Sequence, residues 1–240
     1  ATVNGAGEFG NHTLMSMPLD GSSVPWPMLW IGLSMDVGSA YADGRNVYFG
    51  TLEQDGYLGV CDASGCPEST TSFYVVSEGI AGASAIVHRP SEDAFYIAEP
   101  FTAALSRVDI DSGAIEPFET NQIAVFDLAR NNTHLFWGTA LPEDLEGDGI
   151  EIQNYLARKA FAGGPMEELA ETAEVTAIAV EDGWVYFGEA TGDVSRIPVD
   201  GGEVERLASG FERPSALLVH EGYLYWTDRS RDGGVYRVAL

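Results

Sequence analysis

The sequence predicts an all-β protein built from repeated sheets, and three observations support this fold class. A short phrase of apolar and aromatic residues recurs five times, at residues 47–51, 95–99, 135–139, 185–189 and 224–228. The second residue of each phrase lies at position 48, 96, 136, 186 or 225, so the intervals are 48, 40, 50 and 39 residues. β-Branched and aromatic residues dominate these runs, and Gly, Asp, Asn and Ser separate them, which favours strands over helices. A repeat of this length with several short strands is typical of a propeller or a solenoid.

Each repeat is interpreted as four antiparallel strands, and the fourth repeat displays them most clearly. Its strands are expected at residues 175–180, 184–188, 193–199 and 203–208. Asp182 and Gly183 supply the first tight turn, because glycine tolerates a positive φ angle. The first strand is the most apolar and the fourth is the most charged. That gradient fits a radial blade, with its first strand at a crowded axis and its last at a solvated rim.

The complete fold prediction is a five-bladed β-propeller of four-stranded antiparallel blades, forming a single domain over residues 1–240. The blades are expected at about 37–79, 80–122, 123–174, 175–211 and 212–240. One four-stranded sheet cannot bury both of its faces alone, so the repeated aromatic residues are interpreted as core between neighbouring blades. A row of rings that stacks on a ligand is the alternative.

The fifth repeat stops after its third strand, so we expect the N-terminal segment to join the C-terminal blade and close the ring. Residues 1–11 are Gly-rich and predicted to be frayed. Residues 12–36 are predicted to be closing strands, with 25–34 in the place of a fourth strand. Residues 14–19 and 235–240 both resemble a third strand, which leaves open a monomer or a strand-exchanged oligomer. A six-bladed ring whose N-terminal strands are missing from the chain is the alternative.

One motif carries a resemblance to a known family. Tyr225-Trp226-Thr227-Asp228 matches the motif of the YWTD β-propellers, which include the propeller of the low-density-lipoprotein receptor. Residues 210–219 resemble the segment that precedes this motif, and 194–202 resemble the third strand and turn of bacterial propellers of this type. The resemblance implies a propeller, usually of six blades, and a structural role for Asp228. It implies no single function, because such propellers include receptors, scaffolds and enzymes.

The charge of the chain limits its partners. The sequence has 37 acidic and 12 basic residues and a net charge of −25. Such a surface repels phosphate backbones and anionic lipid, so we expect neither nucleic-acid binding nor attachment to anionic membranes. The most hydrophobic segment, 26–35, is shorter than the roughly 18 residues of a membrane span, so no membrane insertion is expected. Cations, basic partners or a salty medium suit this charge.

The two cysteines indicate a compartment. Cys61 and Cys66 are expected at a strand end and across a short turn, a spacing that brings Cβ atoms within disulfide range. They predict a disulfide and a secreted, periplasmic or cell-surface location. A reduced, buried pair is the alternative. A metal site is disfavoured, because no second cysteine pair or nearby histidine completes four ligands.

The longest insertion, residues 141–152, resembles the opening of a calcium loop. Asp144, Glu146 and Asp148 alternate and are followed by Gly149, so their oxygens can point at one centre while the glycine permits a sharp bend. Tyr155 stands where the closing glutamate belongs, and Glu151 would close the site only with a different geometry. Ca²⁺ is therefore the one cofactor that the sequence suggests, and a solvated acidic loop is the alternative.

Other polar residues recur in the repeats without forming a catalytic pattern. Carboxylates follow the second strands at Glu53, Glu99, Glu189 and Asp228. Arginines recur in the third strands at Arg107, Arg158, Arg196 and Arg237, and we expect them to pair with carboxylates of the neighbouring blade. The histidines are His12, His88, His134 and His220, interpreted as surface residues of turns. Equivalent residues of different blades are separated, so none of these sets predicts a converging acid pair or a triad.

The sequence therefore favours an extracytoplasmic binding or scaffold module over an enzyme. A protein or small-molecule ligand is expected on the face where the loops between second and third strands gather with those between successive repeats. The ligand-binding residues themselves are unknown from the sequence. One rival is a metal-dependent hydrolase or lactonase, or a glycosidase, with acidic side chains converging on the central channel. A second rival is a structural domain without a site of its own.

Overall fold

The computed structural model describes residues 13–16, 26–30, 36–63, 73–141, 153–231 and 233–240. Every regular element in these ranges is a β-strand. The chain divides into two compact units, Ala1–Asn121 and Gln122–Leu240, and each is described by itself. No helix in the described ranges is long and apolar enough to span a membrane.

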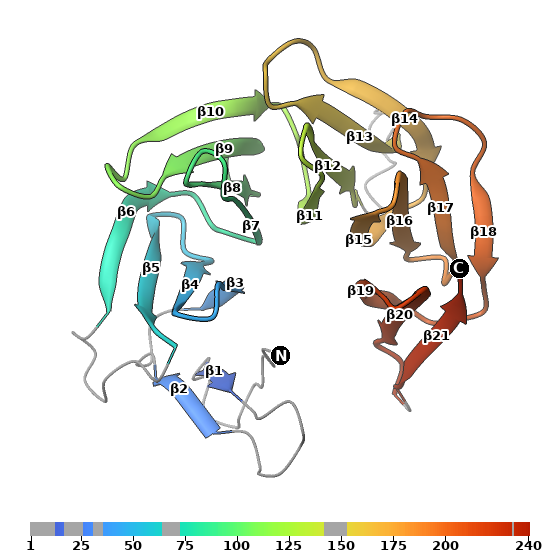
Figure 1. Cartoon of the computed structure of the whole chain (residues 1–240), viewed down its shortest axis with the longest axis horizontal. Coiled ribbons are helices and arrows are strands. Elements are labelled where there is room, and N and C mark those ends of the chain that lie inside the picture. The colour runs from blue at the N-terminus through green and yellow to red at the C-terminus, as the bar shows by residue number, and fades with distance from the viewer. Residues whose placement is uncertain (1–12, 17–25, 31–35, 64–72, 142–152, 232) are drawn as a thin grey trace, which may run out of the picture. The chain divides into compact units, whose positions relative to one another are not determined.

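The first unit holds a two-stranded sheet and two four-stranded antiparallel sheets (Figure 1). The small sheet pairs β1 (Thr13–Ser16) with β2 (Trp26–Trp30). The first full sheet contains β3 (Val37–Ala42), β4 (Asn46–Thr51), β5 (Gly56–Asp62) and β6 (Tyr74–Ile80). The second contains β7 (Ala85–Arg89), β8 (Ala94–Glu99), β9 (Ala104–Asp109) and β10 (Ile115–Thr120).

The second unit holds three more antiparallel sheets (Figure 1). The third sheet contains β11 (Val125–Arg130), β12 (His134–Thr139), β13 (Asn154–Ala160) and β14 (Glu167–Thr172). The fourth contains β15 (Val175–Glu181), β16 (Trp184–Glu189), β17 (Val194–Pro198) and β18 (Glu205–Ala208). The fifth contains β19 (Pro214–His220), β20 (Tyr223–Asp228) and β21 (Val235–Ala239). In all five sheets the strands pair in chain order, as the repeat predicts.

The turns use the residues that the sequence indicated. Asp182 and Gly183 both adopt a positive φ, 48° and 83°, between β15 and β16. Two consecutive positive φ angles give a turn whose twist matches the twist of the strands on either side. Glu221 and Gly222 repeat this geometry between β19 and β20, with φ angles of 49° and 76°.

The two adjacent aromatic residues of the repeat pack on opposite faces of their sheet, as expected for core between sheets. Tyr186 and Phe187 are adjacent in β16, so their side chains point to opposite faces of the fourth sheet. Phe187 packs in a cluster with residues of the third sheet, and Tyr186 packs in a cluster with Leu224 and Trp226 of the fifth. Tyr48 and Phe95 make the same kind of contact in the first unit, with ring centroids 4.8 Å apart.

The glycine that ends several of the aromatic phrases permits close packing between sheets. A Cβ atom on Gly188 would lie 2.8 Å from the Cβ of Pro214, at the start of the next first strand. On Gly138 it would lie 2.3 Å from the Cβ of Val175. Real Cβ atoms do not approach this closely, so a larger residue at either position would force the two sheets apart.

The structure settles one open point and leaves others as predictions. β21 is the third strand of the fifth sheet, and β1 pairs with β2 instead. In the described ranges the fifth sheet therefore has three strands, and residues 26–30 pair with residues 13–16. Ring closure by the N-terminal segment, the number of blades and the single domain over 1–240 stay predictions. The frayed segment predicted at 1–11 lies outside the described residues.

Candidate binding face

Each sheet has one end at which its first strand begins and its second strand ends. We call this end of a sheet its leading end. It corresponds to the face on which the sequence predicts a partner. Four carboxylates lie there, three as the last residue of a second strand and Glu53 two residues after one. Each accepts a hydrogen bond from a backbone N–H of the segment leading into its own sheet. The donor–acceptor pairs are Asp36 to Glu53 (2.8 Å), Ala81 to Glu99 (2.8 Å), Ala173 to Glu189 (2.9 Å) and Arg213 to Asp228 (2.8 Å).

These bonds give the repeated carboxylates a structural role. Each acid ties the incoming segment to the second strand, which fixes how the chain enters the sheet. The backbone N–H of Arg213 lowers the pKa of Asp228, because it stabilises the charged carboxylate. Burial raises the pKa of Glu189, and the bond from Ala173 offsets only part of that shift. An acid occupied in this way is held by the backbone instead of pointing at a substrate.

The third sheet uses a different residue for the same task, one that the repeat pattern does not indicate. The side-chain oxygen of the buried Gln122 accepts hydrogen bonds from Trp137 Nε1 at 2.7 Å and from the Tyr155 hydroxyl at 3.0 Å. Gln122 lies in the segment that leads into β11, so here a side chain of that segment binds the second and third strands. Glutamine appears once at this place, so no repeat could reveal it.

Polar side chains also connect neighbouring first strands within each unit. The Ser39 hydroxyl donates to the Ala83 carbonyl oxygen at 2.8 Å, and the Thr176 hydroxyl donates to the Pro214 carbonyl oxygen. Asp127 lies in β11 at the place that Ser39 occupies in β3, and its carboxylate accepts the backbone N–H of Ile178 at 2.9 Å. The third, fourth and fifth sheets are thus joined through their first strands.

Asp127 is the one of these side chains that can titrate. Burial raises its pKa to about 6, although the backbone N–H groups of Ile178 and Leu128 favour the charged form. The corresponding places in the other four sheets hold Ser39, Ala85, Ala177 and Ala216. Among the described first strands, this register therefore supplies a single carboxylate, not the two that general acid–base catalysis by a pair of acids requires.

The leading ends also carry exposed apolar side chains. In the first unit, Phe101 follows the second strand β8, lies against Gly82 and is 59% exposed. In the second unit, Ile123 precedes β11 and Phe126 lies where the β11–β12 register shifts, and about half of each is exposed. Large apolar side chains on loops held by a rigid scaffold are typical of contact surfaces. The repeat pattern did not reveal these three residues, because none of them belongs to it.

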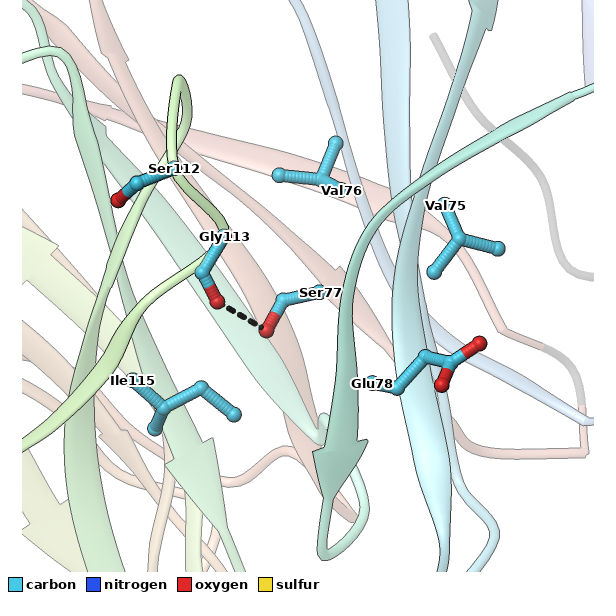
Figure 2. Close-up of a pocket in the computed structure, with 7 residues that line it drawn as sticks. All are labelled: Val75, Val76, Ser77, Glu78, Ser112, Gly113 and Ile115. Atoms are coloured by element: carbon cyan, nitrogen blue, oxygen red, sulfur yellow. Dashed lines mark hydrogen bonds between the residues drawn. The ribbon is translucent and has the colours of Figure 1, made fainter.

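A groove in the first unit lies away from the leading end. It has a volume of about 510 Å³ and is open to solvent, and it lies between β6 and the turn that joins β9 to β10. The lining residues are Val75, Val76, Ser77, Glu78, Ser112, Gly113 and Ile115. Figure 2 shows the Ser77 hydroxyl donating to the Gly113 carbonyl oxygen, a 2.8 Å bond that fastens the turn to β6. Glu78 is the one titratable residue in this lining, so the groove offers no pair of acids.

The histidines differ in environment, and the interpretation of His88 as a surface residue is wrong. Its side chain is 12% exposed and packs against the rings of both Tyr41 and Phe95, at centroid distances of 5.2 and 5.0 Å. His88 lies near the end of β7, a position that suggests exposure. Tyr41 of β3, the first strand of the preceding sheet, packs against the His88 ring and covers it. His220 is exposed, as expected, beside Glu221.

The third-strand arginines pair mainly within their own sheets, which corrects the expected pairing between blades. Arg107 pairs with Glu116 and Arg196 pairs with Glu205, in both cases on the adjacent fourth strand. Arg158 alone also reaches the next sheet, where its guanidinium lies 2.7 Å from the Asp200 carboxylate. A fourth strand lies closer to the third strand of its own sheet than any neighbouring sheet does.

Two predicted sites involve residues outside the described ranges. The calcium loop of Asp144, Glu146, Asp148 and Glu151 lies in 142–152, and Cys66 lies in 64–72. Cys61 is buried at the end of β5. In the part of the chain that the structure does describe, no group of three or more His, Cys, Asp or Glu side chains is arranged to hold a metal ion. The calcium site and the disulfide stay predictions.

Comparisons with known proteins show the fold. No family model matches the chain, and no curated protein matches it. A crystal structure of a nidogen/laminin complex is similar, with a TM-score of 0.76 and 12% identity over 100% of this chain and 88% of that chain. The computationally designed protein Ika8 is similar with a TM-score of 0.61 and 15% identity, covering 96% of this chain and 69% of its own. The designed protein Ika4 has a TM-score of 0.51 and 16% identity, covering 66% and 91%.

These likenesses are consistent with a β-propeller and agree with the fold class that the repeat predicts. At such low identity they carry no information about the residues of a site. No family model or curated sequence confirms the resemblance to YWTD repeats.

Proposed function

We propose that this chain is an extracytoplasmic binding or scaffold propeller whose partner protein contacts the leading ends of the sheets. The observation that carries the proposal is the exposure of Phe101 in the first unit and of Ile123 and Phe126 in the second. The bond from Ala81 to Glu99 in the first unit and the bonds to Gln122 in the second hold the segments around these side chains, so the apolar side chains are presented on a rigid surface. A rigid surface loses little conformational entropy on binding. The similar nidogen/laminin structure is itself a protein–protein complex, which supports the same kind of role.

Site-specific photocrosslinking tests this proposal in each unit separately. A photoreactive phenylalanine analogue replaces Phe126, and a matched variant carries it at Val204, which is also exposed but lies away from the leading end, between β17 and β18. For the first unit, the corresponding positions are Phe101 and Tyr74. Each variant is incubated with the extracellular fraction of the source organism, and the adducts are identified by mass spectrometry.

We expect a defined protein adduct at Phe126 and at Phe101 and none at the two control positions. A Phe126→Ser or Phe101→Ser substitution should reduce capture of the same protein by an unmodified, immobilised chain. Equal crosslinking at leading-end and control positions, or none at any position, would contradict the proposal. The melting temperature of each variant serves as the folding control, because these side chains are exposed.

An enzymatic role is the second candidate, and one observation favours it. Asp127 has a pKa of about 6, which suits proton transfer near neutral pH. The purified chain is assayed against a set of lactones and aryl glycosides, with and without added divalent ions. Turnover that disappears in Asp127→Asn and persists in the control Thr176→Val would support an enzyme. Absence of turnover in the unmodified chain would leave binding as the better account.

Calcium binding at Asp144, Glu146, Asp148 and Glu151 is proposed on the sequence pattern alone. Tight binding to the folded state raises the melting temperature by mass action. We expect added Ca²⁺ to raise it in the unmodified chain and not in a variant with Asp144→Asn and Asp148→Asn. A melting temperature that is insensitive to Ca²⁺ would exclude a tight site.

A further inference from the structure

Three of the sheets contain the same pair of charged residues in the same register. In each, a third-strand arginine lies directly opposite a glutamate of the fourth strand. The pairs are Arg107 with Glu116 (3.5 Å), Arg158 with Glu167 (2.7 Å) and Arg196 with Glu205 (2.8 Å). Opposite charges placed directly across two strands stabilise that register. The fourth strands of this chain are thus matched to the arginines beside them.

A large apolar residue lies two positions after each of these glutamates. Phe118 follows Glu116, and its ring packs edge-on against Tyr96 with centroids 4.9 Å apart. Leu169 and Leu207 occupy the same place after their glutamates and pack on the buried clusters of the third and fourth sheets. The strand register shifts at this apolar residue in all three sheets, and Phe118 nevertheless contacts Tyr96, which pairs with Arg107. The pattern of a fourth strand is therefore an acid, any residue, then a large apolar residue.

In the part of the chain that the structure describes, the fifth sheet has the arginine without a fourth strand beside it. Tyr225 pairs with Arg237 as Tyr186 pairs with Arg196, so the registers are equivalent. The Arg237 guanidinium lies 4.6 Å from the centre of the Tyr223 ring and 3.4 Å from the Tyr225 hydroxyl. Within the described ranges no carboxylate lies within ion-pair distance of it.

The surroundings of Arg237 are also open. In the described chain β21 pairs with β20 alone, so its other edge presents backbone N–H and C=O groups that no strand pairs with. Val235, which lies in β21 itself, is 73% exposed. The edge therefore combines unpaired backbone, exposed apolar surface and a cation, in a chain whose net charge is −25.

We propose that the free edge of β21 binds an extended segment of a partner protein as a fourth strand, and that this segment carries an acid opposite Arg237 and a large apolar residue two places later. The three complete sheets supply the template for its chemistry. Backbone hydrogen bonds to an edge strand provide affinity, and alternate side chains provide specificity. Residues 25–34, which the sequence predicts to close the ring at this sheet, are the competing occupant. They contain no acid and so do not match this pattern, and failure of the full chain to bind the probe described below would favour them. The proposal is independent of the leading ends, because it uses the edge of one sheet.

Peptide binding to the full chain provides the test. The probe is a fluorescent peptide with the sequence of residues 166–173, which contains the pattern at Glu167 and Leu169. The control peptide has the same composition and charge in an order that removes the pattern. We expect the probe to bind and the control to bind at least about tenfold more weakly, since a lost charge-assisted hydrogen bond alone accounts for that factor. Amide hydrogen exchange should slow in β21 when the probe is present.

Charge reversal identifies the contact. Arg237→Glu should weaken binding of the probe about tenfold or more, and a probe with Glu167→Lys should recover affinity for that variant. Arg229→Glu, an exposed arginine in the turn before β21, is the matched control and should leave binding unchanged. The melting temperature of Arg237→Glu shows whether the sheet is intact. Absence of probe binding, equal binding of the scrambled peptide, or affinity that is indifferent to Arg237 would each overturn the proposal.

Discussion

The fourth and fifth sheets share one strand register and differ in what covers them. Both pair a second-strand tyrosine with a third-strand arginine, Tyr186 with Arg196 and Tyr225 with Arg237. In the fourth sheet the tyrosine is 2% exposed, because Leu224 and Trp226 of the next sheet pack over it. Within its unit no sheet follows the fifth, and Tyr225 is only half-buried. The same residues are therefore core in one sheet and surface in the other.

This difference indicates that the stability of a repeat lies mainly in the contact with its neighbour. The intrinsic strand preference of the two sheets is similar, and so are their turns at Asp182–Gly183 and Glu221–Gly222. Truncating equivalent side chains in the two sheets therefore separates two contributions to the free energy of unfolding, that of the contact with the neighbouring sheet and that of the sheet itself.

The largest expected difference comes from truncating the paired tyrosines. Tyr186→Ala should lower the free energy of unfolding by about 3–5 kcal/mol, because it leaves a cavity between two sheets. Tyr225→Ala should cost about 1 kcal/mol or less, because solvent already reaches the ring. Urea unfolding followed by tryptophan fluorescence measures both. Equal losses would mean that Tyr225 is also covered in solution, which would contradict the comparison.

The glycine of the aromatic phrase gives the next largest contrast. Gly188→Thr should destabilise the chain by about 1–3 kcal/mol, because the new side chain meets Pro214. Thr227 occupies the equivalent place in the fifth sheet and fits there, with its hydroxyl 2.9 Å from that of Ser215. Thr227→Gly should cost about 1 kcal/mol or less, through chain entropy and that one hydrogen bond. A tolerated Gly188→Thr would show that the two sheets can separate freely.

A pH-dependent difference is expected between the two borders of the fourth sheet. Asp127 joins it to the third sheet, and Thr176 joins it to the fifth. The folded-state pKa of Asp127, about 6, lies above its ordinary value of 3.8, so its contribution to stability is full below pH 4 and is lost as the pH rises through 6. The loss is about 1–3 kcal/mol, given 1.36 kcal/mol for each pKa unit.

Unfolding measured between pH 4 and 8 checks this expectation. Asp127→Asn keeps an acceptor for the Ile178 N–H and cannot ionise. Its stability relative to the unmodified chain should therefore rise by that amount over the window, whereas Thr176→Val should show no such trend. A constant difference between Asp127→Asn and the unmodified chain would mean that Asp127 titrates normally.

Local pattern was sufficient to predict the sheets, and the contacts that decide a site were not local. The strand predicted at 175–180 is observed at Val175–Glu181, and that predicted at 203–208 at Glu205–Ala208. Alternating apolar residues and turn residues determine such elements within one repeat. The pKa of Asp127 depends instead on its burial, which raises it, and on the backbone N–H of Ile178, 51 residues away, which lowers it. No pattern within one repeat encodes either.

The pairing of arginine and glutamate is an intermediate case. Arg107, Arg158 and Arg196 were recognised as a repeated set from the sequence. Their partners Glu116, Glu167 and Glu205 each lie nine residues later, a constant spacing that could have identified them before the structure was known. A pattern within the third strand alone does not identify the residues beside it, so the partners of these arginines were expected on a neighbouring blade. Considering two adjacent strands together gives the correct pairing.

The smallest expected effect concerns this pair. Glu205→Gln removes the ion pair with Arg196 and should cost about 0.2–1 kcal/mol, because both partners lie near the surface. Arg237→Gln removes the equivalent arginine, which no carboxylate faces in the described ranges. Only its contacts with Tyr223 and Tyr225 are lost, at a cost of about 1 kcal/mol or less. Unfolding at low and high salt distinguishes the two, since only the first difference should shrink when salt screens the charges. A salt-dependent loss in Arg237→Gln would reveal an acidic partner that already faces Arg237 in the isolated chain, and the edge of β21 would then not be free.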